Sequence, residues 1–204
     1  MDQKLAVLFM PDDMTLTKEK TPLMLRPILF CPILTWMVEE LMGQGVERFF
    51  IVSDVRAHDV MRPYISEKAD VTYVDGAKHG EELLKLFKGE KGSVLIVNGA
   101  VLPVGVFSGG AVYSADAKEC CKVLREHGAF AAFPKGAEIS KGFLPVGDEE
   151  ELRSAQDMCR RKIADKHFAA GVSIMDPNNT YIDPRVKIGS GTVILPGTIL
   201  RGRT

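Results

Sequence analysis

The stretch PILTWMVEELMGQGVERFFIVS, residues 32–53, indicates a helix that runs into a buried strand. Pro32 suits the first turn of a helix, where a backbone N–H donor is not needed. Gly43 and Gly45 are expected to end this helix, and the apolar run at 49–53 that follows predicts a strand. The apolar residues that recur at helical spacing are Ile33, Trp36, Met37 and Leu41.

A second apolar run lies on the N-terminal side of this helix. Residues 5–10, LAVLFM, predict a buried strand, and the polar segment 11–21 connects it to the helix. The order is therefore strand, loop, helix, strand. A crossover through a helix implies that the two strands pair in parallel.

The same alternation continues towards the C-terminus and predicts an α/β domain with a mostly parallel sheet. Ser114 is expected to cap one of the later helices, and Asp148 a long one at 149–170. Further strands are predicted at 71–74, 94–97, 111–113 and 129–133, and further helices at 81–87 and 115–126.

The long helix carries an apolar stripe and a set of cations. The cations are interpreted as a solvated helix face, and the apolar stripe as its buried side. The stripe consists of Leu152, Ala155, Met158, Cys159, Ile163 and Phe168, and the cations are Arg153, Arg160, Arg161 and Lys162.

After Gly171 the period changes to six residues. Ile182, Ile188, Ile194 and Leu200 follow one another at this spacing, with small residues between them. This pattern is typical of a hexapeptide β-helix, in which six residues form one side of a triangular coil. Two ordinary hairpins would show a period of two instead.

Composition excludes several classes of protein. The 204 residues are 46% hydrophobic and carry a net charge of −1, so we expect no nucleic-acid partner and no anionic membrane surface as partner. The N-terminus is too short and acidic for a secretion signal, and no apolar run is long enough to span a membrane. The cysteines have no metal or disulfide spacing, which predicts a reduced, cytoplasmic protein. They are Cys31, Cys120, Cys121 and Cys159.

The segment MCRRKIADKHFAAGVSIMDPNNTYIDPRVKIGSGTVILPGTIL, residues 158–200, resembles the domain junction of one bacterial family. This is the family of bifunctional N-acetylglucosamine-1-phosphate uridylyltransferases / glucosamine-1-phosphate acetyltransferases, in which a long helix with an Arg-Arg pair leads into a left-handed β-helix. The matching residues are Arg160, Arg161, Gly171, Val172, Asp176, Pro177, Thr180, Tyr181, Ile182 and Asp183. Looser similarity occurs at LRPILFCPILTWMVEELMGQGVERFFIV (25–52), GAKHGEELLKLF (76–87), VLIVNGAVLPV (94–104) and SGGAVYSADA (108–117).

The resemblance implies a fold and a division of the chain. We expect a Rossmann-like nucleotidyltransferase domain at 1–148, a connecting helix at 149–171, and the first turns of a left-handed hexapeptide β-helix at 172–204. The family forms trimers through its β-helix, so a homo-oligomer is expected. Thr204 falls within a turn of the predicted β-helix, and we expect the protein to continue beyond it.

The resemblance also shows which chemical groups are missing. Family members bind Mg²⁺ with an Asp and an Asn, and Ala100 and Gly147 stand at those places here, so no metal or other cofactor is expected. The family's glycine-rich phosphate loop has no counterpart, because no glycine occurs from Leu5 to Met42. Its Pro-Lys pair is replaced by Pro22 and Leu23. These groups share the task of stabilising phosphate charge, so their joint loss predicts an inactive site without catalytic residues.

A vestigial pocket for a sugar nucleotide is expected at Gly76, His79, Ser108 and Gly110, the first two facing the base and the last two the sugar.

Three functions stay open. The chain is a pseudo-enzyme with a binding, regulatory or scaffolding role; or it is an active uridylyltransferase whose metal is held by Asp12, Asp13 or Asp148; or it is the N-terminal part of a longer hexapeptide acetyltransferase. The alternative to a ligand-binding role for His79 is that of an ordinary surface or packing histidine.

Overall fold

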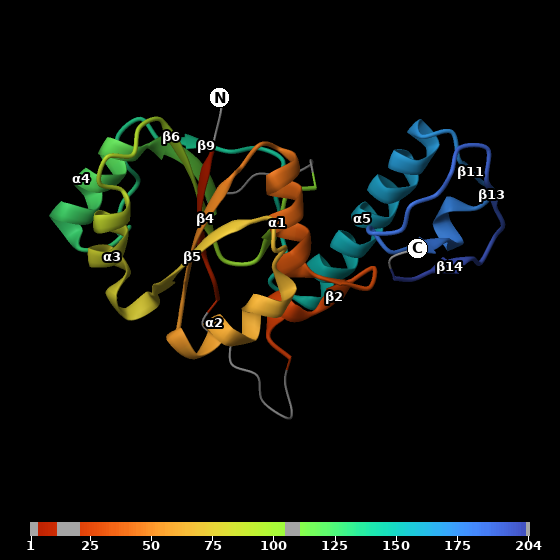
Figure 1. Cartoon of the computed structure of the whole chain (residues 1–204), viewed down its shortest axis with the longest axis horizontal. Coiled ribbons are helices and arrows are strands. Elements are labelled where there is room, and N and C mark those ends of the chain that lie inside the picture. The colour runs from red at the N-terminus through yellow and green to blue at the C-terminus, as the bar shows by residue number, and fades with distance from the viewer. Residues whose placement is uncertain (1–3, 12–20, 105–110, 203–204) are drawn as a thin grey trace.

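The computed structural model describes residues 4–11, 21–104 and 111–202, and its centre is one six-stranded sheet (Figure 1). The strand order is β5-β4-β1-β6-β8-β9. The first four strands in this order run parallel, and β8 and β9 are antiparallel to their neighbours. The strands are β1 Leu5–Phe9, β4 Arg48–Ser53, β5 Asp70–Asp75, β6 Ser93–Asn98, β8 Val112–Asp116 and β9 Glu138–Ile139. The predicted α/β fold with a mostly parallel sheet is confirmed.

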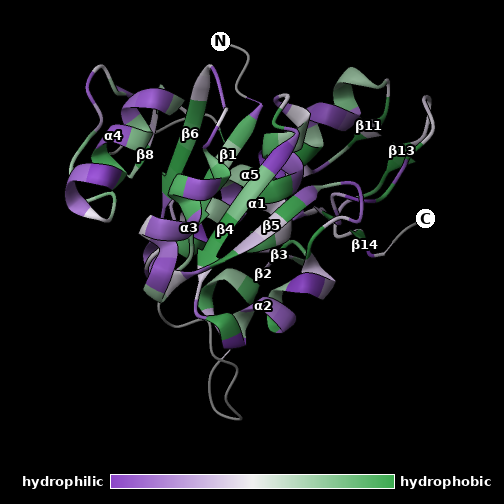
Figure 2. Cartoon of the chain, turned by 60° about the vertical axis from the view of Figure 1, so that its left-hand side comes forward, coloured by the Kyte–Doolittle hydropathy of each residue, from purple (hydrophilic) through white to green (hydrophobic). Residues whose placement is uncertain are grey.

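Apolar residues along each central strand face two separate cores. Ala6 and Leu8 of β1 belong to one hydrophobic cluster, whereas Leu5 and Val7 belong to the other, as the alternation of a strand requires. Helices α1, Ile33–Gly43, and α5, Glu149–Ala169, cover the first face together with α2, Val55–Met61. Helices α3, His79–Leu86, and α4, Ala117–His127, cover the second. In Figure 2 the strands are coloured hydrophobic between these layers.

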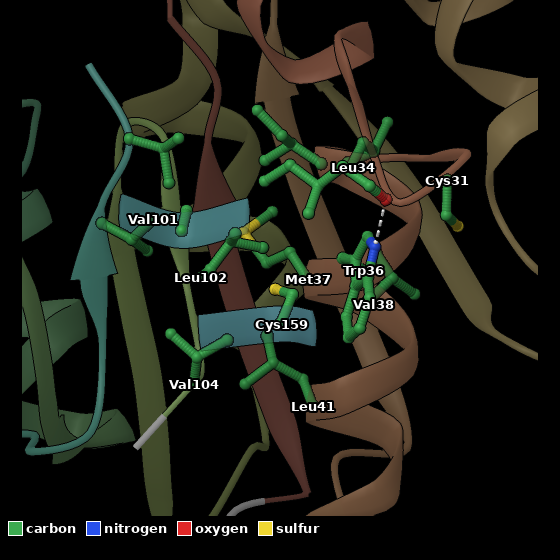
Figure 3. Packing of buried hydrophobic residues seen from close by; sticks show 14 of the residues in the cluster. Cys31, Leu34, Trp36, Met37, Val38, Leu41, Val101, Leu102, Val104 and Cys159 are labelled. Carbon is green, nitrogen blue, oxygen red and sulfur yellow. Dashed lines mark hydrogen bonds between the residues drawn. The ribbon is translucent and has the colours of Figure 1, made fainter. Parts of the chain in front are cut away.

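Figure 3 shows how α5 joins the first core. Cys159 of α5 points towards Leu41 and Met37 of α1, in the same fully buried cluster. Trp36 of α1 packs beside them, and its indole Nε1–H donates to the Ile28 carbonyl over 2.9 Å. The long helix is thus anchored to the α/β part by burial and not merely connected to it.

Two short strand pairs and four 3₁₀ turns lie between the main helices and strands in the described part of the chain. β2, Pro27–Ile28, and β3, Cys31–Pro32, form a hairpin whose two turn residues, Leu29 and Phe30, have φ of 45° and 69°. Bulky side chains rarely adopt this left-handed backbone, so the turn is strained. β7, Val101–Leu102, pairs antiparallel with β10, Leu144–Pro145. The 3₁₀ turns are Leu23–Leu25, Arg62–Tyr64, Gly76–Lys78 and Pro177–Asn179.

Beyond α5 the chain forms two parallel pairs of very short strands. β11, Ser173–Ile174, pairs with β13, Val193–Ile194, and β12, Tyr181–Ile182, pairs with β14, Ile199–Leu200. In Figure 1 this C-terminal segment lies beside α5, on the side away from the large sheet. The residues paired within β12 and β14 are Tyr181 with Ile199 and Ile182 with Leu200.

Several predictions for local structure were wrong. Ser114 lies inside β8, and Asp116 caps α4 by accepting a hydrogen bond from the Lys118 amide over 2.8 Å. Aspartate is a strong helix cap, because its side chain accepts a backbone hydrogen bond and its negative charge is stabilised by the positive end of the helix dipole. Residues 129–133 form no strand, and β9 pairs with β8 instead. Helix α2 and the hairpin of β2 and β3 were not predicted.

The face of α5 also differs from the prediction. Phe168 is 42% exposed, whereas the neighbouring His167 is buried, so the buried side of α5 ends at His167. Arg160 is not solvated: its side chain is 11% exposed, and its guanidinium donates to the carbonyls of Pro177 and Asn178. Among the described residues, no helix is long and apolar enough to cross a membrane.

Candidate functional site

The carboxyl ends of β1, β4 and β6 meet at one edge of the sheet, at the bottom of Figure 1. β1 lies between β4 and β6, and the chain leads from β1 to β4 on one side, whereas β6 on the other side is reached only after β5. The strand order therefore reverses at β1. Such a switch point is the usual place for a ligand in an open parallel sheet. The backbone is closely bonded here: Met10 donates to the Val52 carbonyl over 2.9 Å, and Gly99 to the Phe9 carbonyl over 2.9 Å.

The two positions at which the resemblance implies metal ligands, Ala100 and Gly147, are close to each other at this edge. Pairing of β7 with β10 brings Ala100 next to Val146, whose amide donates to the Ala100 carbonyl over 2.9 Å. Gly147 follows directly, and its amide donates to the Glu151 carboxylate over 2.6 Å. Neither Ala100 nor Gly147 carries a side-chain oxygen or nitrogen, so neither can ligate Mg²⁺ through its side chain.

The aspartates around this edge are engaged as helix caps. Asp54 follows β4 and accepts from the Arg56 amide, Asp75 ends β5 and accepts from the Ala77 amide, and Asp148 accepts from the Glu151 amide. The Arg56 guanidinium also bonds the Asp54 carboxylate and holds the pKa of Asp54 well below its ordinary value. The predicted capping role of Asp148 is confirmed.

Gly76 and His79 are brought to the same edge. Gly76 packs on the end of β4, where an added Cβ would lie 3.2 Å from the Ser53 carbonyl oxygen. The Nδ1 atom of His79 lies 2.6 Å from the Gly76 carbonyl oxygen, so this bond requires the proton on Nδ1. The imidazole also meets the Phe9 ring edge-on at 5.6 Å. His79 is half-buried and held on both sides.

The structure brings together only part of the predicted site. Ser108 and Gly110 lie outside the described residues, as do Asp12 and Asp13. Within the described ranges, no group of three His, Cys, Asp or Glu side chains is arranged to hold a metal ion.

Two residues at this edge were not singled out from the sequence. Phe9 supplies an aromatic surface that contacts both His79 and Phe130. Asn98, the last residue of β6, is exposed and aligned with Phe9 in the parallel register. A polar residue at the end of a buried strand is the sequence signal that would have found Asn98.

Parts of this chain match known proteins, although no family model matches it. The bifunctional protein GlmU of Caldanaerobacter subterraneus is 49% identical over 65 residues, which cover 32% of this chain and 14% of that protein. GlmU of Rubrobacter xylanophilus is 51% identical over 59 residues, covering 29% and 13%. GlmU of Listeria innocua is 48% identical over 83 residues, covering 41% and 18%. The matched stretches thus span less than a fifth of each relative, and over them this chain is related to the GlmU family, as its motifs predicted.

Proposed function

We propose that the chain is a catalytically inactive relative of the sugar-1-phosphate nucleotidyltransferases that serves in binding, regulation or scaffolding. Its parts are a nucleotidyltransferase-like domain at 1–148, a connecting helix at 149–171 and a C-terminal segment at 172–204. The kinship with GlmU proteins and the parallel α/β sheet support the family. The site supports the loss of catalysis.

The contact between Ala100 and Val146 carries the proposal. The bond from Val146 brings Gly147, the next residue, close to Ala100, and the resemblance implies Mg²⁺ ligands at these two positions, where this chain has a hydrogen and a methyl group. Phosphoryl transfer depends almost entirely on positioning and on neutralising phosphate charge. A site without the ion must supply that charge stabilisation by other cations, and the aspartates nearby would oppose it.

A vestigial sugar-nucleotide pocket fits the same edge. Gly76 packs closely on the end of β4, and next to it the His79 imidazole and the Phe9 ring, which stand perpendicular to each other, offer a polar and an aromatic contact for a base. Ser108 and Gly110 would complete this pocket on the sugar side. A sugar nucleotide is therefore the proposed small-molecule partner.

Turnover and binding are measured separately to test this proposal. Pyrophosphate release is followed with UTP, N-acetylglucosamine-1-phosphate and Mg²⁺, with an intact GlmU protein as the positive control. We expect no release above the blank, whereas turnover that depends on Mg²⁺ would refute inactivity. Calorimetric titration with UDP-N-acetylglucosamine, with and without Mg²⁺, is expected to give binding that is independent of the metal.

A second candidate function rests on the C-terminal segment. The parallel partners Tyr181 and Ile199, and Ile182 and Leu200, are each 18 positions apart, which equals three sides of six residues. This register supports the first coil of a left-handed hexapeptide β-helix and hence the N-terminal part of a longer acetyltransferase. Val193, Leu195 and Ile199 are exposed on the coil, which favours a homo-oligomer. Light scattering on this chain and on the full gene product would separate this role from the first.

An active uridylyltransferase with a rewired metal site is the least supported alternative. Asp148 already caps α5, and its carboxylate would have to leave the Glu151 amide to bind a metal. Asp12 and Asp13 lie outside the described residues. The pyrophosphate assay decides this alternative as well.

We place the protein in the cytoplasm, which the state of its cysteines supports. All four are free thiols. Burial raises the pKa of Cys31 to about 11 and that of Cys159 to about 12, so these thiols stay protonated and unreactive. Such cysteines fit a reducing compartment.

A further inference from the structure

A cleft of about 620 Å³ lies between the end of α1 and the second half of α5. Its walls come from Gln44 after α1, from the loop that follows β7, from the loop that precedes β10 and from one side of α5. This volume lies in the range of small-molecule sites. α1 crosses back between two parallel strands, so its C-terminal end lies at the edge of the sheet opposite to Ala100 and Gly147.

The floor of the cleft is apolar and belongs to the large hydrophobic cluster. Phe143 is 6% exposed and Val104 is 9% exposed, and both belong to the large hydrophobic cluster. Met158 of α5 is half-buried and packs against the same cluster. Val104 lies in the part of this cluster that Figure 3 shows around Leu41 and Cys159. A flat apolar group could therefore bury its surface here without moving the core.

The rim carries three cations from two different walls. Lys141 belongs to the loop before β10, and Arg161 and Lys162 belong to α5. Lys162 is held in place by the Glu40 carboxylate and lies 3.5 Å from the Pro103 carbonyl oxygen. Lys141 and Arg161 make no ion pair with any residue in the described ranges, and both are exposed.

The charge of the rim is not balanced by its own residues. Asp165 is the single carboxylate among the described lining residues, and Glu40 already faces Lys162. Two cations from different segments that line one cleft above an apolar floor attract an anion bound in that cleft. A solvated helix face accounts for Arg153, which does not line this cleft, but it does not account for a Lys from a separate loop that lines the same cleft as Arg161.

We propose that this cleft binds an organic phosphate, with the phosphate between Lys141 and Arg161 and an apolar ring on Phe143, Val104 and Met158. The guanidinium of Arg161 can donate two parallel hydrogen bonds to phosphate oxygens, and the Lys141 ammonium can donate to a third. The inference is independent of the proposed loss of catalysis, because it uses none of the residues at the other edge of the sheet.

The test uses phenyl phosphate as the probe, with inorganic phosphate, benzyl alcohol and benzoate as partial probes. Binding to the ¹⁵N-labelled full chain is followed by NMR, with the Gly142 amide as the local reporter. We expect saturable shifts at Gly142 with phenyl phosphate and weaker binding of each partial probe. Arg161→Gln removes one of the two charged partners and should weaken the affinity for phenyl phosphate about tenfold. Lys141→Gln should weaken it similarly.

Arg153→Gln is the matched control, because Arg153 is an exposed cation on the same helix outside the cleft. Its affinity for phenyl phosphate should equal that of the unaltered chain. All three substituted residues are exposed, so the variants are expected to fold, and thermal melts check this.

Four results would overturn the proposal. They are the absence of saturable shifts, equal affinity in Arg161→Gln, inorganic phosphate binding as tightly as phenyl phosphate, and benzoate binding as tightly as phenyl phosphate.

Discussion

The amide N–H of Val146 donates to the carbonyl of Ala100 over 2.9 Å, and this bond joins two segments that lie far apart in the sequence. It places Gly147 beside Ala100 at the carboxyl edge of the sheet. The proposed loss of catalysis assigns the absent metal ligands to these two positions, and introducing an Asp and an Asn there is a direct test of that proposal.

The double variant Ala100→Asp with Gly147→Asn should bind Mg²⁺ together with UTP. Gly147 does not have a left-handed φ, and the nearest atom to its added Cβ would be a flexible Glu151 carboxylate oxygen at 3.2 Å, so an Asn fits. We expect Mg²⁺ to tighten UTP binding about tenfold in the variant and not in the unaltered chain.

Calorimetry with and without Mg²⁺ measures this difference. The control is Ala100→Asn with Gly147→Asn, which has the same size but lacks the anionic ligand. If the charged and the neutral variants behave alike, the site at this edge is not a vestigial metal site.

Gly80 on α3 should be the least replaceable glycine of the α/β part. A Cβ there would lie 1.6 Å from the carbonyl oxygen of Gly128, which ends α4, so the two helices would have to separate. Gly80→Ala is expected to lower the free energy of unfolding by about 3 kcal/mol or more, since the clash involves backbone.

Urea denaturation measures this loss, and Gly43→Ala is the matched control. An added Cβ on Gly43 meets nothing within 4 Å, and the residue lies in α1. That substitution should stabilise the protein slightly, by up to about 1 kcal/mol, because Ala favours the helix. Equal effects of the two changes would contradict the close approach of α3 to α4.

Arg160 should be required as an arginine and not only as a cation. Its guanidinium donates to Asp157 over 2.8 Å and to the Pro177 and Asn178 carbonyls, and it lies 6.0 Å from the centre of the Tyr181 ring. A lysine cannot reproduce this fork, so Arg160→Lys should destabilise the C-terminal segment by about 2 kcal/mol.

Hydrogen exchange of the amides in β11 to β14 reports this loss locally. Arg153→Lys on the same helix is expected to change nothing measurable, because Arg153 is exposed. The interpretation fails if Arg160→Lys leaves the exchange rates of these strands unaltered.

Asp183 should make the stability of the C-terminal segment dependent on pH. Its side chain is 1% exposed; burial alone would raise the pKa, but bonds from Arg185 and from the Gly202 amide outweigh it and lower the pKa. A carboxyl group with a depressed pKa contributes stability above its unfolded pKa of about 4, and that contribution is lost as the pH falls through the folded pKa.

Urea unfolding between neutral pH and pH values below about 4 checks this sign. The unaltered chain should lose stability in acid, and Asp183→Asn should be less stable at neutral pH, by about 3 kcal/mol, since it leaves Arg185 unpaired. The difference between the two proteins should shrink in acid. A constant difference across the titration would rule out Asp183 as its source.

Much of the α/β part was predictable because its signals are local. The run at residues 5–10 and the one at 49–53 are apolar on both faces, as is typical of central parallel strands, and both form neighbouring strands. The capping by Asp148 was equally local, since a cap depends on a side chain and an amide three residues away.

Competition between neighbouring residues was less predictable. Ser114 and Asp116 are both good caps, and the longer pairing of β8 with β6 decided that the helix begins after Asp116. The same strand pairing leaves residues 129–133 without a partner and gives that place to β9. Strand pairing is a tertiary interaction, so local preference alone could not rank these alternatives.

The sequence by itself determined the alternation of strands and helices, the six-residue period and the absence of side-chain ligands at Ala100 and Gly147. Only the tertiary structure decided that Val146 bonds to Ala100, that Arg160 is withdrawn from solvent while Arg161 is not, and that Lys141 and Arg161 line the same cleft. The reason is physical. Periodicity and composition are properties of neighbouring residues, whereas contacts between distant segments depend on how whole helices and strands bury their apolar faces together.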